Sequence, residues 1–454
     1  MKNNLLKRYI GPKEFYKKVA IIALPVAIQQ FLNSSMGIIS TIMVSQIGQV
    51  TAVGNAVQLE IVIITICFGA VTGAGIFVAQ FFGAENPAKQ KQSFGFGVIV
   101  CVGIGVIGMI IAHLFGRNIL AFFVDDPVVT EMSWKYLRIS LFSFIPICVH
   151  LMFSFAYRGI QKTFIPMIIS SISMFVGVCI NYLLIFGNFG FPELGVQGAA
   201  IGVVSAQTLA VIIHVVFAKV SKQPFMGSIK EVFKIEKKLA HSITKKTIPF
   251  TFNEFLFAMG GILYIRAFGQ LGADAMESYY VGNQISNIFF FVVMGIGSAC
   301  AAVLGASLGK GDMQEARRSG DYFIGMGLIV SLIAAIVILL SAEYLVMIFN
   351  LTDADIIRNS VLIVQVFALR LALRMFNVIV FASLRAGGDS KFLALLDSGI
   401  MWAIGIPLTF LLVGWFGITS IALVYLIVQV EQLIRMIVGL KRYNSDKWLQ
   451  NLTR

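Results

Sequence analysis

Apolar residues run along this chain in twelve long stretches that are separated by short polar segments. Each stretch is at least as long as the roughly 20 residues that an α-helix needs to cross the hydrocarbon core of a bilayer. The second and eighth stretches are longer, which predicts tilted or bent helices. The pattern predicts an all-α integral membrane protein with twelve transmembrane helices. The predicted spans lie at roughly 19–43, 55–80, 93–114, 134–157, 165–187, 195–218, 247–270, 279–306, 320–341, 359–384, 392–413 and 417–439.

The two halves of the chain carry the same spacing of prolines and glycines. In Pro25–Gly48 a proline is followed by glycines after 12 and 23 residues, and Pro249–Gly272 repeats both intervals. Further on, Val53-Gly54-Asn55 is matched by Val281-Gly282-Asn283. Six spans precede the basic segment 219–246 and six follow it, so both halves begin on the same side of the membrane. The sequence therefore predicts a parallel internal repeat, an arrangement that is common among membrane transporters.

The basic segment also sets the expected domain boundaries and the orientation. We expect an N-terminal six-helix lobe at 1–218, a basic cytoplasmic linker at 219–246, and a C-terminal six-helix lobe with a cytoplasmic tail at 247–454. If the N-terminus is cytoplasmic, 27 of the 35 lysines and arginines fall on the cytoplasmic side. This bias predicts a multi-pass protein of the cell membrane with both termini in the cytoplasm.

Composition supports a membrane protein and excludes several other classes. Charged residues make up 13% of the chain and the mean hydropathy is +0.88, whereas a soluble domain has about 25% charged residues. The net charge of +13 is explained by the loops, so no nucleic-acid partner is expected. The five cysteines all fall in apolar spans and show no disulfide or metal-ligand spacing. The first apolar stretch is too long for a signal peptide, so we interpret it as a retained span.

Several motifs are spread over nearly the whole chain. They are TGAGIFVAQFFGAENPAKQKQ (72–92), SFAYRGIQKTFIPMIIS (154–170), NYLLIFGNFGFPELGVQGAAIG (181–202), PFTFNEFLFAMGG (249–261), GASLGKGDMQEARRS (305–319), LRAGGDSKF (384–392) and RYNSDKWLQNLT (442–453). Together they resemble the MATE family, the multidrug and toxic compound extrusion transporters, and most closely the branch common in Firmicutes. The resemblance implies two six-helix lobes that form a V around a central cavity. It also implies antiport of organic, mostly cationic compounds against Na⁺ or H⁺ by alternating access.

The N-terminal half departs from the family at one position. The family usually places an aspartate in the outer part of span one, where this chain has Ser40. Glu60 in span two lies at a similar depth, and our hypothesis is that it supplies the missing carboxylate; a side chain that extends toward the outer headgroups is the alternative. Asn181 matches a family position near the first-lobe cation site, where its carbonyl oxygen would be a Na⁺ ligand or a helix–helix contact.

In the C-terminal half, Glu254 is the principal candidate for ion coupling. It follows Asn253 in span seven, in an Asn-Glu pair that the family repeats at this place. An ionisable group near the bilayer centre costs about 2.5–3.5 kcal/mol, so each one suggests a function. A single buried carboxylate can hold a proton, a Na⁺ ion or a cationic substrate, but only one at a time. A structural carboxylate paired with a neighbouring arginine is the alternative.

Two further carboxylates, Asp397 in span eleven and Glu431 in span twelve, lie at a comparable depth. Arg370 and Arg374, one turn apart on span ten, are the expected counter-charges. These groups would form either an ion relay or a salt-bridge lock, and the sequence favours neither. We also assign Asp397 and Glu431 to ion coupling together with Glu254.

The remaining assignments concern the substrate, the hinge and the ion ligands. Substrate contacts are expected from Asn253, Glu254, Arg374 and Phe289, since aromatic faces attract flat cations. Pro25 interrupts span one and is the expected hinge. Asn181 and Glu254 are the possible Na⁺ ligands. No cofactor other than the coupling ion is expected, and the expected partners are small organic cations and membrane lipids, with no obligate protein partner.

Two other functions compete with efflux. A flippase for lipid-linked glycans or cell-wall precursors would share the scaffold, but it would need a basic cavity, and Arg266, Arg370 and Arg374 all lie in one half. A membrane-embedded transferase or protease would need a metal cluster or a nucleophile–base pair. The spans show neither at a convincing spacing, so we do not expect an enzyme.

Overall fold

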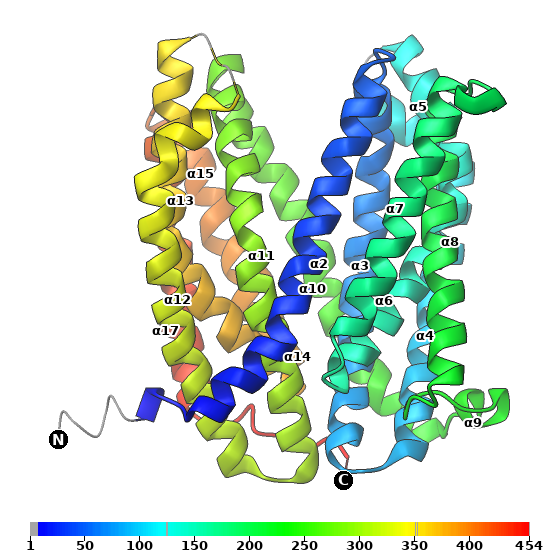
Figure 1. Cartoon of the computed structure of the whole chain (residues 1–454). Helices are drawn as coiled ribbons and strands as arrows, with labels where there is room; N and C mark the ends of the chain where they lie inside the picture. Colours follow the sequence, from blue (N-terminus) through cyan, green and yellow to red (C-terminus); the bar gives the residue numbers. More distant parts are fainter. Residues whose placement is uncertain (1–7, 124–125, 350, 352, 454) are drawn as a thin grey trace. The chain divides into compact units, whose positions relative to one another are not determined.

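The computed structural model describes residues 8–123, 126–349, 351 and 353–453 (Figure 1). Within these residues the protein consists of helices and connecting turns, with no strand. Twelve helical segments are long and apolar enough to cross a membrane, which confirms the number of spans predicted from hydropathy. Residues 1–7 of the predicted cytoplasmic tail lie outside the described residues.

Some of the spans consist of more than one helix. The fourth joins α5 to α6 through a short 3₁₀ turn, the eleventh runs from α14 to a π-helical turn beyond α15, and the twelfth joins α16 to α17. The helices are α2 (Lys13–Ser45), α3 (Val50–Gly83), α4 (Pro87–Phe123), α5 (Pro127–Ser140), α6 (Phe144–Gly159), α7 (Phe164–Phe186), α8 (Val196–Val220), α9 (Ile229–Phe233), α10 (Lys237–Gly269), α11 (Ala273–Lys310), α12 (Met313–Met347), α13 (Ala354–Ala386), α14 (Ser390–Ala394), α15 (Ile406–Phe410), α16 (Ile421–Val428) and α17 (Val430–Asn444).

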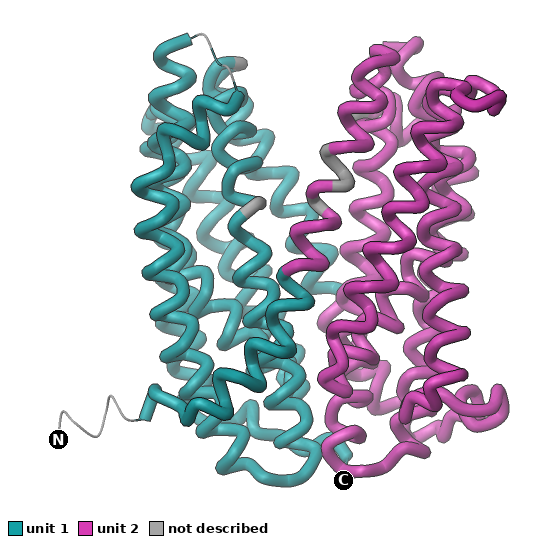
Figure 2. The backbone as a smooth tube through the Cα atoms, in the orientation of Figure 1, with its two compact units in different colours: residues 1–27, 252–454 teal, residues 28–251 magenta. Residues whose placement is uncertain are grey.

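The helices pack into two compact units (Figure 2). Unit 1 contains residues 1–27 and 252–454, and unit 2 contains residues 28–251. Both boundaries fall inside a helix, two residues after Pro25 in α2 and two residues after Pro249 in α10. The boundaries expected from the sequence divide the chain into its two repeated halves. In the structure, the first part of α2 packs in unit 1 with the C-terminal half of the chain. The first part of α10 packs in unit 2 with the N-terminal half.

Glycines allow these crossed helices to pack closely. A Cβ atom added to Gly295 of α11 would lie 2.7 Å from the backbone oxygen of Ala23 in α2. A Cβ atom added to Gly69 of α3 would lie 2.5 Å from the Cα atom of Thr251 in α10. Small residues permit such backbone contact between membrane helices. In each unit, the helix segment that comes from the other half of the chain therefore packs against a glycine.

A turn of one kind ends six of the described helices and recurs in both halves of the chain. In each turn a residue in the left-handed conformation is followed by an N–H that donates to the carbonyl five residues earlier. This is the Schellman turn, in which glycine is favoured because it has no Cβ atom. Unit 1 has Gly311 and Gly388 at this position. Unit 2 has one glycine, Gly48, and three other residues, Glu85, Gln161 and Lys222. The three non-glycine turns of unit 2 thus carry backbone strain that the two glycine turns of unit 1 avoid.

We expect the substitution Gln161→Gly to increase the free energy of unfolding by about 0.5–1 kcal/mol. A left-handed non-glycine residue costs roughly 1–2 kcal/mol, and the flexibility of glycine in the unfolded chain offsets part of that gain. Thermal unfolding of the purified protein in detergent measures the change. The matched control is Gly388→Ala, which introduces the same strain in unit 1 and should lower stability. An unchanged melting temperature for both variants would contradict the argument.

Candidate functional site

A buried polar cluster lies within unit 1, where the middle of α10 meets the eleventh and twelfth spans. Asn253 on α10, Asp397 on a π-helical turn after α14, and Glu431 and Arg435 on α17 all belong to it. Asp397 and Glu431 are each 7% exposed and Arg435 is 1% exposed. Charged groups this deeply buried are stable only when they are paired and hydrogen-bonded.

Arg435 connects the two carboxylates of the cluster. Its guanidinium nitrogens lie 3.5 Å from Oδ1 of Asp397 and 3.6 Å from Oε1 of Glu431. One of them also donates to the backbone oxygen of Asp397 at 3.0 Å. These two ion pairs are long for charge-assisted contacts, which are usually about 2.7–2.9 Å. One guanidinium is therefore shared between two carboxylates, and neither carboxylate holds it tightly.

Glu431 is fixed by neutral donors as well. The hydroxyl of Tyr264 donates to Oε2 of Glu431 at 2.6 Å, and the amide of Gln432 donates to Oε1 at 3.1 Å. Gly405 contacts the same atoms, since a Cβ atom there would overlap both the Tyr264 hydroxyl and the Glu431 carboxylate. The carboxylate of Glu431 is consequently held in one orientation.

A local change in helix geometry positions Asp397. Residues Leu395–Gly399 form a π-helical turn, a feature often found at functional sites. Asn253 of α10 packs against this turn: its amide donates to Oδ2 of Asp397 at 3.2 Å and its carbonyl oxygen accepts from the Ser398 hydroxyl at 2.7 Å. The backbone N–H of Ser398 also donates to the Asn253 side chain, at 3.3 Å. Asn253 therefore contacts the π-helical turn directly, as part of the cluster.

Glu254 forms a separate pair in unit 1. Its Oε1 lies 2.8 Å from a guanidinium nitrogen of Arg385, near the end of α13, and the two side chains are 13% and 23% exposed. Asn253 and Glu254 are neighbours in the sequence but have different partners. Asn253 forms a hydrogen bond with Asp397, and Glu254 forms an ion pair with Arg385. The structure places Glu254 in an ion pair, the alternative that the sequence left open.

The expected counter-charges Arg370 and Arg374 are not the direct ion-pair partners of the carboxylates, although Arg374 interacts electrostatically with all three. The structure pairs the carboxylates with Arg385 and Arg435 instead. Arg370 donates to the hydroxyl of Tyr425 at 2.6 Å. The guanidinium carbon of Arg374 lies 5.2 Å from the ring centre of Phe290, which is a cation–π distance. The direction in which each side chain leaves its helix decides which partner it meets. The depth of a residue in the membrane, which is all that the sequence indicates, does not give this direction.

The substrate contacts expected at Arg374 and Phe289 remain a prediction. Arg374 lies on α13 and Phe289 on α11, two helices that pack together in unit 1. Phe289 is partly exposed, and its neighbour Phe290 makes the cation–π contact with Arg374. Arg374 therefore contacts the phenylalanine next to the predicted one, and a role of Phe289 in substrate binding stays a prediction.

The candidate residues of unit 2 are buried in two places. The amide of Asn181 donates to the Ser40 hydroxyl at 3.4 Å, and its carbonyl oxygen has no hydrogen-bond partner among the described residues. Glu60 is 6% exposed, and its Oε1 likewise has no partner among the described side chains and backbone groups. Glu60 faces Ser140 at the end of α5. Both residues thus present buried oxygen atoms that could ligate a cation, and the Glu60 carboxylate could instead take up a proton.

The sequence contained a signal for one of the missed residues. Arg435 follows Glu431 by four residues, a spacing that brings two side chains together on one face of a helix. Arg385 was hidden because the predicted span ended before it, whereas α13 continues to Ala386. Tyr264 and Ser398 carried no signal, since neither their type nor their spacing distinguishes them from other residues of the spans.

The arrangement brings together oxygen atoms of the kind that bind small cations. Asp397 and Glu431 share the guanidinium of Arg435, and the buried Arg374 also interacts electrostatically with both carboxylates. Carboxylate, hydroxyl and amide oxygens are the ligands that hard cations prefer. The described residues contain no group of three or more His, Cys, Asp or Glu side chains that would hold a metal ion. A proton or a monovalent cation fits this donor set better than a transition metal.

Twelve spans, a duplicated half and ionisable groups buried within the spans are typical of membrane transporters. The sequence profile of the MatE family matches residues 25–183 and 249–411, so the chain belongs to the MATE family of multidrug efflux transporters. The resemblance noted in the motifs is thereby confirmed.

Individual relatives agree with this family. The probable multidrug resistance protein NorM of Thermotoga maritima is 24% identical over 427 residues, covering 92% of this chain and 90% of the relative. The probable multidrug resistance protein YoeA of Bacillus subtilis is 21% identical over 402 residues, covering 87% of each. The fold is similar to that of a mutant of the Vibrio cholerae MATE transporter VcmN, with a TM-score of 0.87 and 15% identity over 96% of this chain and 98% of that one. These relatives are transporters and not enzymes.

Proposed function

We propose that the protein is an antiporter that exports organic, mostly cationic compounds in exchange for Na⁺ or H⁺. The observation that carries this proposal is the set of buried carboxylates in unit 1, two of which, Asp397 and Glu431, share the guanidinium of Arg435 at 3.5 and 3.6 Å. Such a site gains a proton or a cation readily, and the gain changes the charge that a cationic substrate meets. The names of the multidrug resistance relatives support the substrate class. No observation favours the flippase.

In this proposal Glu254 performs the ion-coupled step with Arg385 as its partner in the empty state. The guanidinium of Arg385 holds the carboxylate at 2.8 Å. A proton, a Na⁺ ion or a cationic substrate would compete with Arg385 for the same oxygen atoms. The coupling ion is the only cofactor in this scheme. Asp397 and Glu431 provide a second place for the ion, while Asn181 and Glu60 provide oxygen ligands in unit 2.

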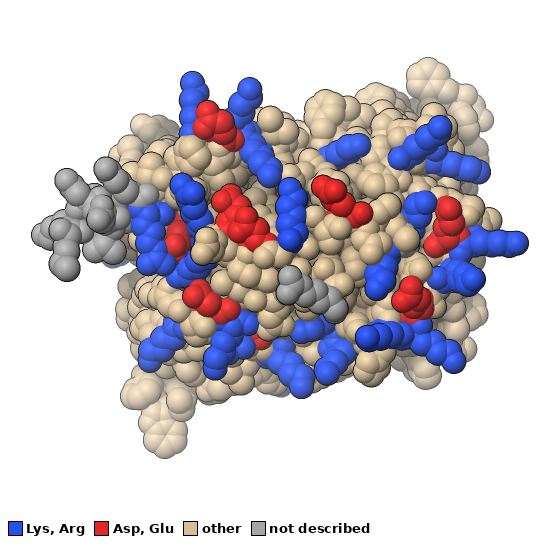
Figure 3. All heavy atoms as spheres, turned by 90° about the horizontal axis from the view of Figure 1, so that it is seen from below, with Lys and Arg blue, Asp and Glu red and all other residues tan. Residues whose placement is uncertain are grey.

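The orientation is part of the proposal. Lysine and arginine side chains gather on the face of each unit that is seen from below in Figure 3. An excess of these residues is typical of the cytoplasmic side. We therefore place this face, with both ends of the chain, in the cytoplasm and the protein in the cell membrane.

Alternating access would require α2 and α10 to bend, since each of these helices belongs to both units. Pro25 and Pro249 lie two residues before the crossing points, and proline removes a hydrogen bond from a helix interior. Pro25 is the hinge expected from the sequence, and Pro249 occupies the matching place in the second half.

Transport by proteoliposomes tests the proposal. Efflux of an ethidium-type dye is measured under an imposed Na⁺ gradient and, separately, an imposed pH gradient. We expect Glu254→Gln to reduce gradient-driven efflux at least 100-fold with little change in the yield of folded protein, because the amide cannot exchange a cation. The control Glu193→Gln alters an exposed loop acid and should leave efflux unchanged. Full activity of Glu254→Gln would refute the assignment of Glu254, and absence of dye efflux under both gradients would refute the function.

A further inference from the structure

The duplication gives each of the two units an equivalent pocket. Each pocket lies between the beginning of the third helix and the end of the last helix of its half. The pocket of unit 1 has a volume of about 670 Å³ and is formed by the start of α12 and the tail after α17. The pocket of unit 2 has a volume of about 570 Å³ and is formed by the start of α4, the end of α8 and the segment before α9. A comparison of the two shows which one is still available for a ligand.

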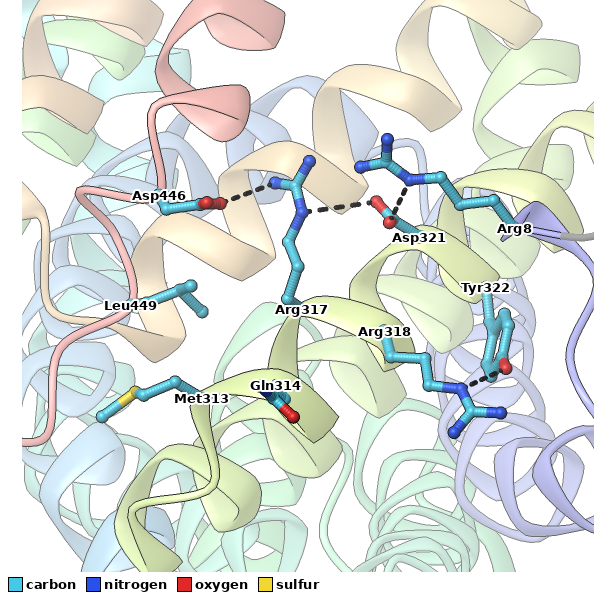
Figure 4. Close-up of a pocket in the computed structure, with 9 residues that line it drawn as sticks. All are labelled: Arg8, Met313, Gln314, Arg317, Arg318, Asp321, Tyr322, Asp446 and Leu449. Carbon is cyan, nitrogen blue, oxygen red and sulfur yellow. Dashed lines mark hydrogen bonds and ion pairs between the residues drawn. The ribbon is translucent and has the colours of Figure 1, made fainter. Parts of the chain in front are cut away.

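Internal ion pairs occupy the pocket of unit 1 (Figure 4). Arg317 lies between Asp446, at 3.1 Å, and Asp321, at 3.7 Å. Asp321 also binds Arg8 at 2.7 Å, and this hydrogen bond raises the pKa of Arg8 above its ordinary value. Arg318 donates to the hydroxyl of Tyr322 at 2.6 Å. The acidic side chains of this pocket thus neutralise its central cation.

The pocket of unit 2 is formed by the equivalent helices, but its charged residues differ. Lys91 occupies the place of Arg317, since each follows the first residue of its helix by four positions. It is paired in the same way, with Glu231 of α9 at 3.1 Å. The backbone amide of Ser228 and the ammonium group of Lys91 lower the pKa of Glu231, so this pair stays charged at neutral pH. One lysine of the pocket is therefore neutralised.

The remaining basic groups of this pocket are not neutralised. Lys222 occupies the left-handed corner where unit 1 has Asp446, so the duplication has placed a cation where the other unit has an anion. Lys219 lies one turn before it, and both side chains are exposed. Within the part of the chain that the structure describes, neither ammonium group takes part in an ion pair. The lining residues described for this pocket include no aspartate or glutamate.

The walls of this pocket are ordered by specific contacts. Gln223 is 4% exposed, and its carbonyl oxygen accepts from Lys162 at 3.2 Å. Ser228 and Glu231 form a reciprocal capping box at the start of α9. The two unpaired lysines therefore lie beside residues that are fixed by hydrogen bonds. An anion between these lysines would meet an ordered surface.

The surroundings of this pocket indicate a lipid. Three apolar side chains next to it are strongly exposed: Val220 at 77%, Ile229 at 79% and Phe233 at 44%. Apolar side chains beside a lysine cluster are typical of segments that lie in the headgroup region of a membrane. Basic pockets on the cytoplasmic side of membrane proteins bind anionic headgroups. We propose that the pocket formed by Lys91, Lys219 and Lys222 binds the phosphodiester headgroup of an anionic phospholipid from the cytoplasmic leaflet.

Binding of defined lipids to the purified full-length protein tests this proposal. Native mass spectrometry in detergent counts the bound molecules during titration with short-chain phosphatidylglycerol, phosphatidylcholine of the same chain length, or glycerol phosphate. We expect phosphatidylglycerol to bind at least tenfold more tightly than phosphatidylcholine. The double variant Lys219→Gln/Lys222→Gln should bind it about 30-fold more weakly, equivalent to about 1 kcal/mol for each lysine.

A matched control separates this pocket from general surface charge. The variant Lys237→Gln/Lys238→Gln removes two exposed lysines that do not line the pocket, and it should change the affinity less than threefold. The single variant Lys222→Gly removes one ammonium group and also relieves the left-handed backbone, so it should be at least as stable as the natural chain and still bind the lipid about sixfold more weakly.

Three results would overturn the proposal. The first is equal affinity for phosphatidylglycerol and phosphatidylcholine. The second is an equal loss of affinity in the control variant, which would indicate diffuse surface charge. The third is glycerol phosphate binding as tightly as the lipid, which would indicate a site for a soluble phosphate.

Discussion

Replacing Arg435 with methionine is expected to prevent the protein from accumulating in its folded form. Methionine fills a similar volume, but it leaves Asp397 and Glu431 without the one guanidinium that they share. Removal of one partner from a buried ion pair typically destabilises a protein by about 3–5 kcal/mol. Total stability is commonly only about 5–15 kcal/mol, so most of the margin would be lost. The yield of monodisperse protein and its melting temperature measure the effect.

A second substitution should restore part of this loss. In the double variant Arg435→Met/Asp397→Asn one of the two carboxylates becomes neutral, and the amide still accepts a hydrogen bond from Asn253. We expect folded protein to return, with a lower melting temperature than that of the natural chain. Arg358→Met, which removes an exposed arginine from α13, is the control and should have little effect. If Arg435→Met alone folds as well as the natural protein, the two carboxylates are not held by this guanidinium.

The number of spans could be predicted from the sequence because hydropathy is a local property. A stretch of apolar residues must be buried in lipid wherever it lies, and a helix is the form that satisfies its backbone there. The π-helical turn at Asp397 could not be predicted in this way. A π turn contains the same apolar residues as an α turn, and contacts with Asn253 and Arg435 on other helices stabilise it.

The carboxylates of the candidate site were predictable for a similar reason, and their partners were not. A buried Asp or Glu is expensive, so Glu254, Asp397 and Glu431 stand out in any apolar stretch. Several arginines lie at comparable depth, and only the rotation of each helix about its axis decides which of them reaches a carboxylate. Arg435 could be predicted as a partner from its spacing to Glu431. Arg385 could be predicted only if the end of α13 at Ala386 was known.

The repeat was visible in the sequence, whereas the crossing of α2 and α10 between units was not. Spacing shows that two segments are equivalent, but it does not show which half of the chain each segment packs against. That choice depends on contacts such as the one between Gly69 and Thr251, which are 182 residues apart.

Introducing valine at Gly69 is expected to abolish transport and to lower the free energy of unfolding by about 3 kcal/mol. A Cβ atom there would lie 2.5 Å from the Cα atom of Thr251 and 2.8 Å from the backbone oxygen of Phe250, and backbone atoms cannot rotate away. Gly73, one turn further along α3, packs against Thr247 of α10 in the same way. The two helices would therefore have to separate along two turns. Thermal unfolding and dye efflux measure the two effects.

The same helix provides the control for this substitution. Gly54 also lies in α3, and a Cβ atom there would meet no atom within 4 Å, so Gly54→Ala should fold and transport normally. Glu254 follows Thr251 by less than one turn, so a shift of α10 at Thr251 also moves the carboxylate away from Arg385. A Gly69→Val protein that transports at the natural rate would show that α10 need not stay against α3. Close contact between these two helices would then be excluded as a condition for ion coupling at Glu254.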